Sequence, residues 1–238
     1  MTLPWRAVAR PAGLSQRLRA RLRSALSACV LAALLLLLLQ TPAPAAWDAG
    51  RMLTAAQAHN ARAVAGVRAL HALVGATQAL PERTRLEAMN RFFNERIAFV
   101  EDSDTVGTAD DWASPVELMA RGAGDCEDYS IAKYFGLIGA GVPSEKLRMV
   151  YVRAELGGSV RAHMVLAYYA SASAEPLVLD NLQGNIRPAS QRPDLKAVFS
   201  FNAEGLWKGT GASGAGDPVA RLSRWRDVLA KARSEGFL

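Results

Sequence analysis

The hydrophobic pattern of this chain changes its period once, at Gly139-Ala140-Gly141. Before that point apolar residues recur at the spacing of amphipathic helices, and after it they alternate as in half-buried strands. The expected helices span 47–80, 81–97, a short segment opened by the capping box Ser114-Pro115-Val116-Glu117, and 126–138. The expected strands span 147–154, 161–169, 177–181 and 197–201. Helices followed by antiparallel strands predict an α+β fold, in which the helix at 126–138 packs on the sheet.

Residues 1–46 have the composition of an export segment. Arginines at 6, 10, 17, 19, 21 and 23 precede the apolar run 28–39, no acidic residue occurs, and Ala43-Pro44-Ala45 before Ala46 matches an A-x-A cleavage site. We therefore expect a signal peptide and an exported domain, or an N-terminal membrane anchor if the segment is not cleaved. Cys29 lies at the start of the apolar run and does not follow it, which argues against a lipid anchor.

The net charge of the chain belongs to this leader. The sequence has 28 basic and 22 acidic residues, and the two numbers become equal without the six leader arginines. A neutral domain has no electrostatic reason to bind nucleic acid, so we expect no such partner. The remainder is expected to form one domain at 47–208, a glycine-rich linker at 209–216 and an amphipathic helix at 217–238.

Cys126 is the only thiol left once the leader is removed. An exported domain with one cysteine cannot form an internal disulfide, so this thiol is buried and inert, paired between chains, or used in chemistry. It lies in Gly124-Asp125-Cys126-Glu127-Asp128-Tyr129, in the first turn of the helix expected at 126–138. The free N–H groups and the dipole of a helix N-terminus favour thiolate over thiol.

His163 and Asp180 are the expected partners of this thiol. Of the three histidines, His59 and His71 fall in the N-terminal helical region, whereas His163 begins a strand downstream of Cys126. Positions 163 and 180 have their midpoint at 171.5, inside the turn expected at 170–175, so an antiparallel hairpin brings them together. Asp180 would then orient the imidazole as the third member of a triad. Each residue alone also has an ordinary structural interpretation, but the three together favour a thiol enzyme.

Three carboxylates flank the thiol and oppose its activation. Asp125, Glu127 and Asp128 should raise the pKa of Cys126 unless a cation neutralises them. Adjacent oxygen ligands suit Ca²⁺ better than zinc, which would need more Cys or His than the chain has. The alternative is that the acids only stabilise the helix N-terminus. The acidic stretch 101–111 lacks the EF-hand spacing and is expected to be a solvated loop.

At these positions the sequence resembles the bacterial transglutaminase-like cysteine proteinases. The matching segments, in the family's order, are Asn90-Arg91-Phe92-Phe93-Asn94, Gly124-Asp125-Cys126-Glu127-Asp128-Tyr129 with Ala132-Lys133-Tyr134-Phe135, Ala162-His163-Met164-Val165-Leu166, Leu177-Val178-Leu179-Asp180-Asn181-Leu182, and Ser200-Phe201-Asn202 with Gly205-Leu206-Trp207. The alanine-rich N-terminal helix and the glycine-rich segment after Lys208 have no counterpart in this resemblance.

The resemblance implies a papain-like or transglutaminase-like fold with a defined triad. Cys126 would be the nucleophile, His163 the general base and acid, and Asp180 the residue that orients His163. It also implies calcium-dependent proteolysis, with Asp125 and Glu127 as ligands and Asp128 beside them.

The resemblance further implies a substrate and an inhibitor. The substrate would be a large surface adhesin, cut at a di-alanine site near its N-terminus, so that the protease controls biofilm attachment. The inhibitor would be an inner-membrane receptor whose periplasmic domain holds the protease when cytoplasmic cyclic di-GMP is high. Trp112 is the candidate docking residue, with ordinary packing beside the active-site helix as the alternative.

Other functions are compatible with the same residues. A transglutaminase-type acyl transferase or a cell-wall peptide hydrolase would use the same Cys-His-Asp set. A calcium-responsive binding module would retain the set without catalysing a reaction.

Overall fold

The computed structural model describes residues 47–101, 111–211 and 214–238. The leader at 1–46 and residues 102–110 of the acidic stretch lie outside the described residues, so what the sequence predicts for them stays a prediction. Among the described helices, none combines the length and apolar character needed to cross a membrane.

The N-terminal part of the fold consists of α2 (Ala49–His59), α3 (Ala61–Thr77) and α4 (Glu82–Arg96). The single helix predicted for 47–80 is wrong because Asn60 interrupts it with an extended backbone, at φ −166° and ψ 175°. The Asn60 side chain accepts a hydrogen bond from the Ala63 N–H and thereby caps α3. Pro81 directly precedes α4 and is not in its first turn.

Two further helices, α5 (Pro115–Arg121) and α6 (Cys126–Gly139), carry the segment around the cysteine. The predicted capping box is confirmed at the start of α5, where Ser114 and Glu117 each accept a hydrogen bond from the other's backbone N–H. α5 ends at Gly122, whose φ of 68° lies in the left-handed region. The helix predicted for 126–138 is confirmed as α6. Between α4 and α6, β1 (Ala98–Phe99) pairs in parallel with β2 (Ala123–Gly124), which the sequence analysis did not predict.

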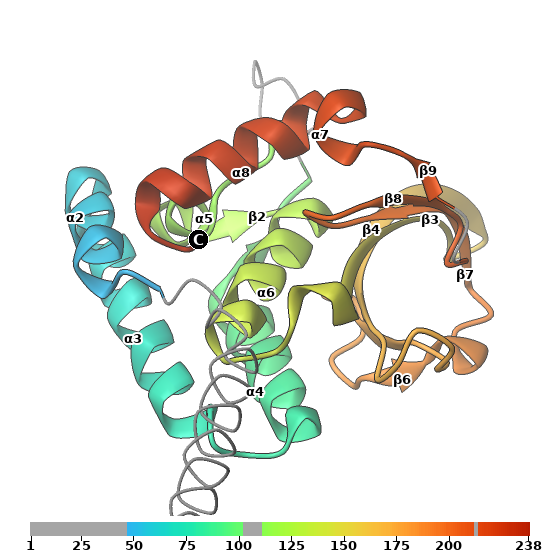
Figure 1. The fold of residues 1–238 in the computed structure, drawn as a ribbon, viewed down its shortest axis with the longest axis horizontal. Helices are drawn as coiled ribbons and strands as arrows, with labels where there is room; N and C mark the ends of the chain where they lie inside the picture. The colour runs from blue at the N-terminus through green and yellow to red at the C-terminus, as the bar shows by residue number, and fades with distance from the viewer. Residues whose placement is uncertain (1–46, 102–110, 212–213) are drawn as a thin grey trace, which may run out of the picture. The chain divides into compact units, whose positions relative to one another are not determined.

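The remaining strands form one antiparallel sheet in the order β6-β5-β4-β3-β7-β8-β9. They are β3 (Leu147–Leu156), β4 (Ser159–Tyr168), β5 (Leu177–Leu179), β6 (Arg187–Pro188), β7 (Leu195–Phe201), β8 (Leu206–Lys208) and β9 (Gly214–Gly216). The four predicted strands correspond to β3, β4, β5 and β7. Figure 1 shows a strongly curved sheet with the helices gathered to one side of it, so the predicted α+β organisation is confirmed.

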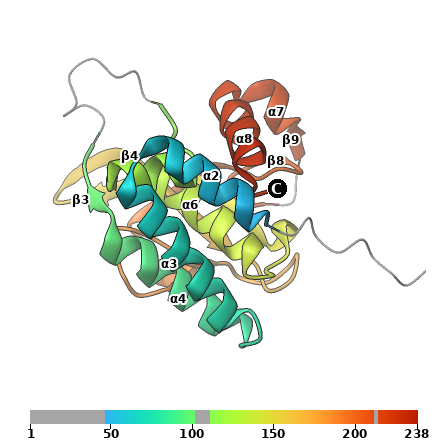
Figure 2. The same cartoon turned by 90° about the vertical axis from the view of Figure 1, so that its left-hand side faces the viewer.

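The main core lies between α6 and the sheet. It contains Tyr134 and Phe135 from α6 and Met149, Leu166 and Phe201 from the strands. Figure 2 shows α2, α3 and α4 lying over α6, away from the sheet. Burying a side chain of this size stabilises a fold by about 1.5–3 kcal/mol. The helix that begins at the cysteine is therefore held by packing on both sides.

The glycine-rich segment is partly a strand. β9 pairs with β8, with Trp207 opposite Gly214, so the linker predicted for 209–216 is wrong over Gly214–Gly216. This strand could not be predicted from the sequence, because its Gly-Ala-Gly residues show no alternation of large apolar and polar side chains.

The C-terminal segment forms two helices, α7 (Pro218–Arg221) and α8 (Ser223–Glu235), and not the single helix predicted for 217–238. The chain bends at Leu222, whose backbone is not helical. Trp225 of α8 is fully buried against the rings of Tyr134, Phe135 and Phe201. α8 therefore completes the main core.

Candidate active site

Cys126 is the first residue of α6, and a hydrogen bond from α6 to strand β4 fixes this end of the helix. Asp125 precedes it as the N-cap residue, with an extended backbone. The Ser130 hydroxyl lies 2.9 Å from the carbonyl oxygen of Cys126 and 3.2 Å from that of Met164, the residue after His163. One side chain thus joins the first turn of the cysteine helix to the strand that carries the histidine.

His163 and Asp180 are brought together by the β4–β5 hairpin. His163 Nε2 lies 2.9 Å from Asp180 Oδ1, and both side chains are buried. Leu166 lies opposite Leu179, which moves the centre of the hairpin by one residue from the position predicted. If this register is continued past β5, His163 and Asp180 become diagonal neighbours, which long side chains can span.

The carboxylate fixes the orientation of the imidazole. Because Nε2 faces Asp180, Nδ1 is the ring nitrogen left for a thiol. Asp180 Oδ1 also accepts from the Leu182 N–H at 3.0 Å, and Arg192 Nη2 donates to Oδ2 at 2.8 Å. Burial acts to raise the pKa of Asp180, but the hydrogen bonds from His163, Leu182 and Arg192 outweigh it and lower the pKa to about 2. Asp180 is therefore ionised at neutral pH.

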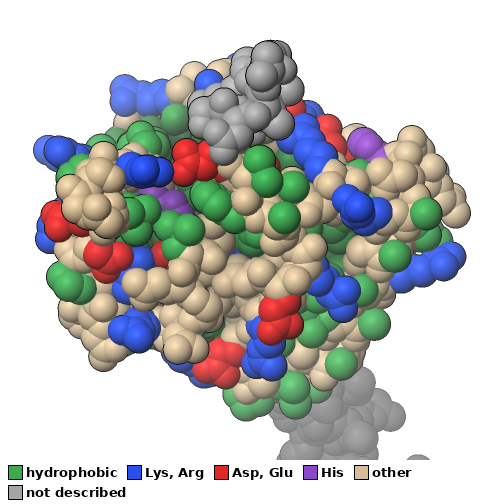
Figure 3. Space-filling model, turned by 180° about the vertical axis from the view of Figure 1, so that it is seen from behind, with side chains coloured by type: hydrophobic (Ala, Val, Ile, Leu, Met, Phe, Trp, Pro, Cys, Tyr) green, Lys and Arg blue, Asp and Glu red, His purple; other side chains and the backbone are tan. Residues whose placement is uncertain are grey.

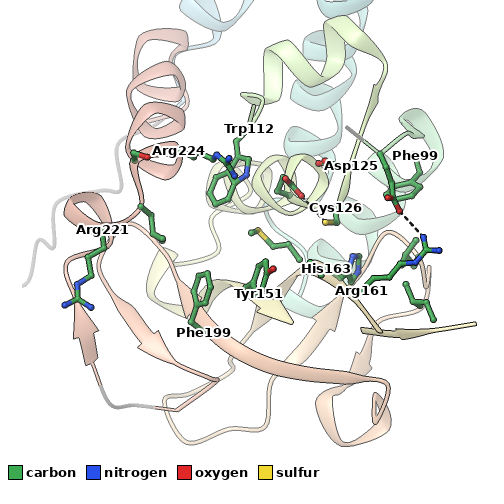
Figure 4. A pocket seen from close by; sticks show the side chains of 18 residues that line it. Phe99, Trp112, Asp125, Cys126, Tyr151, Arg161, His163, Phe199, Arg221 and Arg224 are labelled. Carbon is green, nitrogen blue, oxygen red and sulfur yellow. Dashed lines mark hydrogen bonds and ion pairs between the residues drawn. The ribbon is translucent and has the colours of Figure 1, made fainter. Parts of the chain in front are cut away.

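Cys126 and His163 line the same cavity, whose volume is about 1080 Å³ (Figure 4). Aromatic side chains cover part of its wall, where the rings of Tyr151 and Phe199 are stacked with centroids 5.1 Å apart. The end of α7 and the start of α8 contribute polar residues on another side, among them Arg221 and Arg224. Such a cavity, apolar with a few polar groups, suits an extended peptide segment.

Charge is dispersed on the face of the molecule that Figure 3 displays. Basic and acidic side chains lie among apolar and polar ones there, without gathering into one large patch of either sign.

The surroundings of Cys126 favour its neutral thiol. Burial is the largest factor that raises its pKa, and the charges of Glu127 and Asp125 raise it further. The Cys126 Sγ–H also donates a hydrogen bond to Glu127 Oε2 at 3.0 Å. The predicted opposition between the flanking acids and thiol activation is thus confirmed for these two carboxylates.

The three predicted calcium ligands differ in position. Asp125 and Glu127 line the cavity, whereas Asp128 is buried and accepts a hydrogen bond from the Ala113 N–H at 2.8 Å. In the part of the chain that the structure describes, no three His, Cys, Asp or Glu side chains form a metal-holding cluster. The donor chemistry still suits a hard cation. Burial raises the pKa of Glu127, and the nearby charge of Asp128 adds to this, so a cation would relieve the crowding of carboxylates.

Three polar residues near Asp180, none of them predicted from the sequence to belong to the site, are Asn94, Arg192 and Lys133. Asn94 donates to the Asp180 carbonyl oxygen at 2.8 Å, and Arg192 donates to its carboxylate. Burial lowers the pKa of Lys133 on α6 to about 7, although the charge of Asp180 acts in the opposite direction. Asn94 and Lys133 belong to segments that carry the family resemblance, so that resemblance could have pointed to them. Arg192 lies in a polar connection between strands, where nothing in the sequence marks it.

Trp112 is 9% exposed, and its ring stacks on that of Phe201 with centroids 5.8 Å apart. This is the packing arrangement that the sequence analysis kept as the alternative to docking. Trp112 also lines the cavity, so an edge of the ring stays accessible from the site.

Comparison with known proteins relates this site to an enzyme class. Residues 64–195 match the family model described as bacterial transglutaminase-like cysteine proteinase. Solved structures of LapG from Legionella pneumophila are similar along most of the chain. The EGTA-treated form is 38% identical, with a TM-score of 0.69, and the match covers 78% of this chain and 98% of that one. The calcium-bound form is 37% identical, with a TM-score of 0.67, and the match covers 77% and 98%. No curated protein sequence gives a match.

The fold and these matches define a cysteine protease with a transglutaminase-like fold. The chain belongs to the bacterial transglutaminase-like cysteine proteinase family.

Proposed function

We propose that this protein is a calcium-dependent endopeptidase in which Cys126, His163 and Asp180 form the catalytic triad. The observation that carries the proposal is the buried His163–Asp180 hydrogen bond at a cavity that Cys126 also lines. The Cys126 sulfur would attack the scissile carbonyl, and His163 would take the thiol proton and deliver it to the leaving amine. Water would then hydrolyse the thioester with His163 as base. The Cys126 backbone N–H is a candidate donor to the oxyanion.

Asp125 and Glu127 are the residues that would hold calcium, with Asp128 behind them. A cation bound there would neutralise the carboxylates that keep Cys126 protonated. A calcium-bound and an EGTA-treated structure of Legionella LapG support the proposal, since they indicate that a relative binds the ion.

The substrate that we propose is a large surface adhesin, cut at a di-alanine site near its N-terminus. This places the protease in the periplasm, in agreement with the basic and apolar leader at 1–46. Cleavage would release the adhesin and end biofilm attachment. We also propose that an inner-membrane receptor for cyclic di-GMP inhibits the protease by covering the cavity, where it would meet the accessible edge of Trp112.

The test is cleavage of the N-terminal region of a large surface adhesin that contains a di-alanine site, with mass spectrometry of the products. The wild-type protein should yield two fragments with a new carboxylate and a new free amine, whereas Cys126→Ala should leave the substrate intact. His59→Ala is the control, because it replaces an exposed residue of α2 that does not line the cavity and should leave cleavage normal. Cross-linked or amidated products would identify an acyl transferase instead, and normal cleavage by Cys126→Ala would exclude the proposed nucleophile.

A further inference from the structure

Asp180 is held at both carboxylate oxygens, and each oxygen faces a different side chain. Oδ1 accepts from His163 and from the Leu182 N–H, whereas Oδ2 accepts from Arg192 Nη2 at 2.8 Å. The Asp180 side chain is fully buried and that of Arg192 is 3% exposed. Hydrogen bonds between charged groups in such a dry site are shorter and stronger than neutral ones.

The guanidinium of Arg192 is itself fixed by a second carboxylate. Its Nε lies 3.0 Å from Asp194 Oδ1, and its Nη2 lies 2.8 Å from Asp194 Oδ2. The backbone adds to this, because the Arg192 N–H donates to the Ala189 carbonyl oxygen and the Arg192 carbonyl oxygen accepts from the Leu195 N–H. Arg192 can therefore move only if the loop between η3 (Ala189–Gln191) and β7 moves.

The charged and titratable side chains around Asp180 come from three elements. His163 belongs to β4 and Lys133 to α6, whereas Arg192 and Asp194 belong to the loop before β7. The fully buried amino group of Lys133 interacts with the charge of Asp180, but among the described residues it forms no hydrogen bond with the carboxylate. Arg192 is the cation that bonds directly to the oxygen facing away from His163.

The geometry points to Arg192 as a positioning residue for the proposed triad, which sets both the orientation of Asp180 and the share of its charge that acts on His163. This inference rests on the roles proposed for Cys126, His163 and Asp180. A carboxylate clamped at Oδ2 is restrained from rotating, so Oδ1 stays directed at Nε2 and the imidazole keeps one orientation, with Nδ1 left for the thiol.

Arg192→Met removes both the hydrogen bond that orients Asp180 and the positive charge beside it. Arg192→Lys removes only the orienting fork and keeps the charge. Arg192→Met should lower kcat by on the order of 10²-fold with little change in KM. It should also move the pH profile of kcat/KM to higher pH, because loss of a buried cation raises the pKa of neighbouring groups. Arg192→Lys keeps the charge without the planar fork, so its pH profile should stay near that of the wild type while kcat falls.

A second readout requires no substrate. The pH dependence of Cys126 alkylation by iodoacetamide, measured in calcium, reports the thiol and the imidazole that acts on it. It should shift to higher pH in Arg192→Met and remain in place in Arg192→Lys. If the wild type fails to cut the adhesin, the proposed substrate is wrong, yet the alkylation profiles still decide the role of Arg192.

Arg85→Met is the matched control for a purely structural arginine. Arg85 Nη1 donates to the Ala140 carbonyl oxygen at 2.7 Å, at the opposite end of α6. This variant should lower the melting temperature without moving either pH profile. If Arg192→Met behaves like Arg85→Met, Arg192 is structural only and the inference is wrong. If Arg192→Met does not fold, Arg192→Lys and Asp194→Asn decide, and wild-type kcat in both would overturn the inference.

Discussion

At the scale of single residues, Cys126 is under two opposing influences. The N-terminus of α6 favours the thiolate, whereas burial and the charges of Glu127 and Asp125 raise the pKa of the thiol. The second influence prevails in the structure, and Cys126 donates a hydrogen bond to Glu127. A thiol protease with this arrangement needs something to reverse the effect of the acids.

Replacing Glu127 should therefore have opposite effects with and without calcium. In EGTA, Glu127→Gln should be alkylated at Cys126 by iodoacetamide about 10-fold faster than the wild type at neutral pH, since one pKa unit corresponds to about tenfold. In calcium the order should reverse, because the variant lacks a proposed ligand. Glu101→Gln is the control, since Glu101 lines the same cavity but is paired with Arg161 at 3.6 Å. Equal rates for wild type and Glu127→Gln in EGTA would contradict this account of the thiol.

The three members of the proposed triad could be predicted from the sequence, but the residues that hydrogen-bond to them could not. Chain order and hairpin arithmetic were enough to pair His163 with Asp180, even though the actual register differs by one residue. Arg192 reaches Asp180 only through the path of the loop before β7, which no periodicity encodes. Asp128 is held away from the cavity by a hydrogen bond from the Ala113 N–H, a contact between two segments that the sequence pattern does not predict.

At the scale of elements, α8 is attached to the start of α5 through a buried acid. Glu235 Oε1 accepts a hydrogen bond from the Ser114 hydroxyl, while Oε2 is buried and has no hydrogen-bond partner among the described residues. Burial is the main factor that raises the pKa of Glu235 to about 7, and the charge of Glu117 adds to it. The contact is therefore best satisfied when Glu235 is protonated.

The attachment of α8 should weaken as pH rises. The native state holds this proton up to about pH 7, whereas the unfolded chain loses it near pH 4.5, so the stability that Glu235 confers falls across that interval. Glu235→Gln should be more stable than the wild type by about 2 kcal/mol at pH 8 and should lose this advantage at pH 5. Melting curves at both pH values measure the difference. Glu95→Gln, at an exposed position of α4, should show no such dependence on pH.

Element predictions failed where a single polar or small residue decided the outcome. Asn60 looked like one more residue of an alanine-rich helix, yet its side chain caps α3 and ends α2. Gly214–Gly216 looked like a linker, yet β8 provides an edge for it to pair with. Long periodic segments such as α6 and β3 were predicted well because burial dictates their pattern.

At the scale of the whole molecule, the fold brings four segments to one cavity. The start of α6 carries the thiol, β4 carries the histidine, the segment after β5 contributes Leu182, and the segment from Arg221 to Arg224 forms part of another wall. Asp180 lies buried behind His163 and does not line the cavity. The C-terminal segment is thus both part of the core and part of the site. The central claim is that thiol reactivity and calcium binding are linked at this cavity.

The most direct test is a calcium titration of the wild-type protein that follows adhesin cleavage and Cys126 alkylation in parallel. Both rates should be minimal in EGTA and should rise with the same half-activating calcium concentration. Asp125→Ala should move the two midpoints together to higher calcium. Cleavage at full rate in EGTA, or alkylation that does not respond to calcium while cleavage does, would contradict the link between nucleophile and ion.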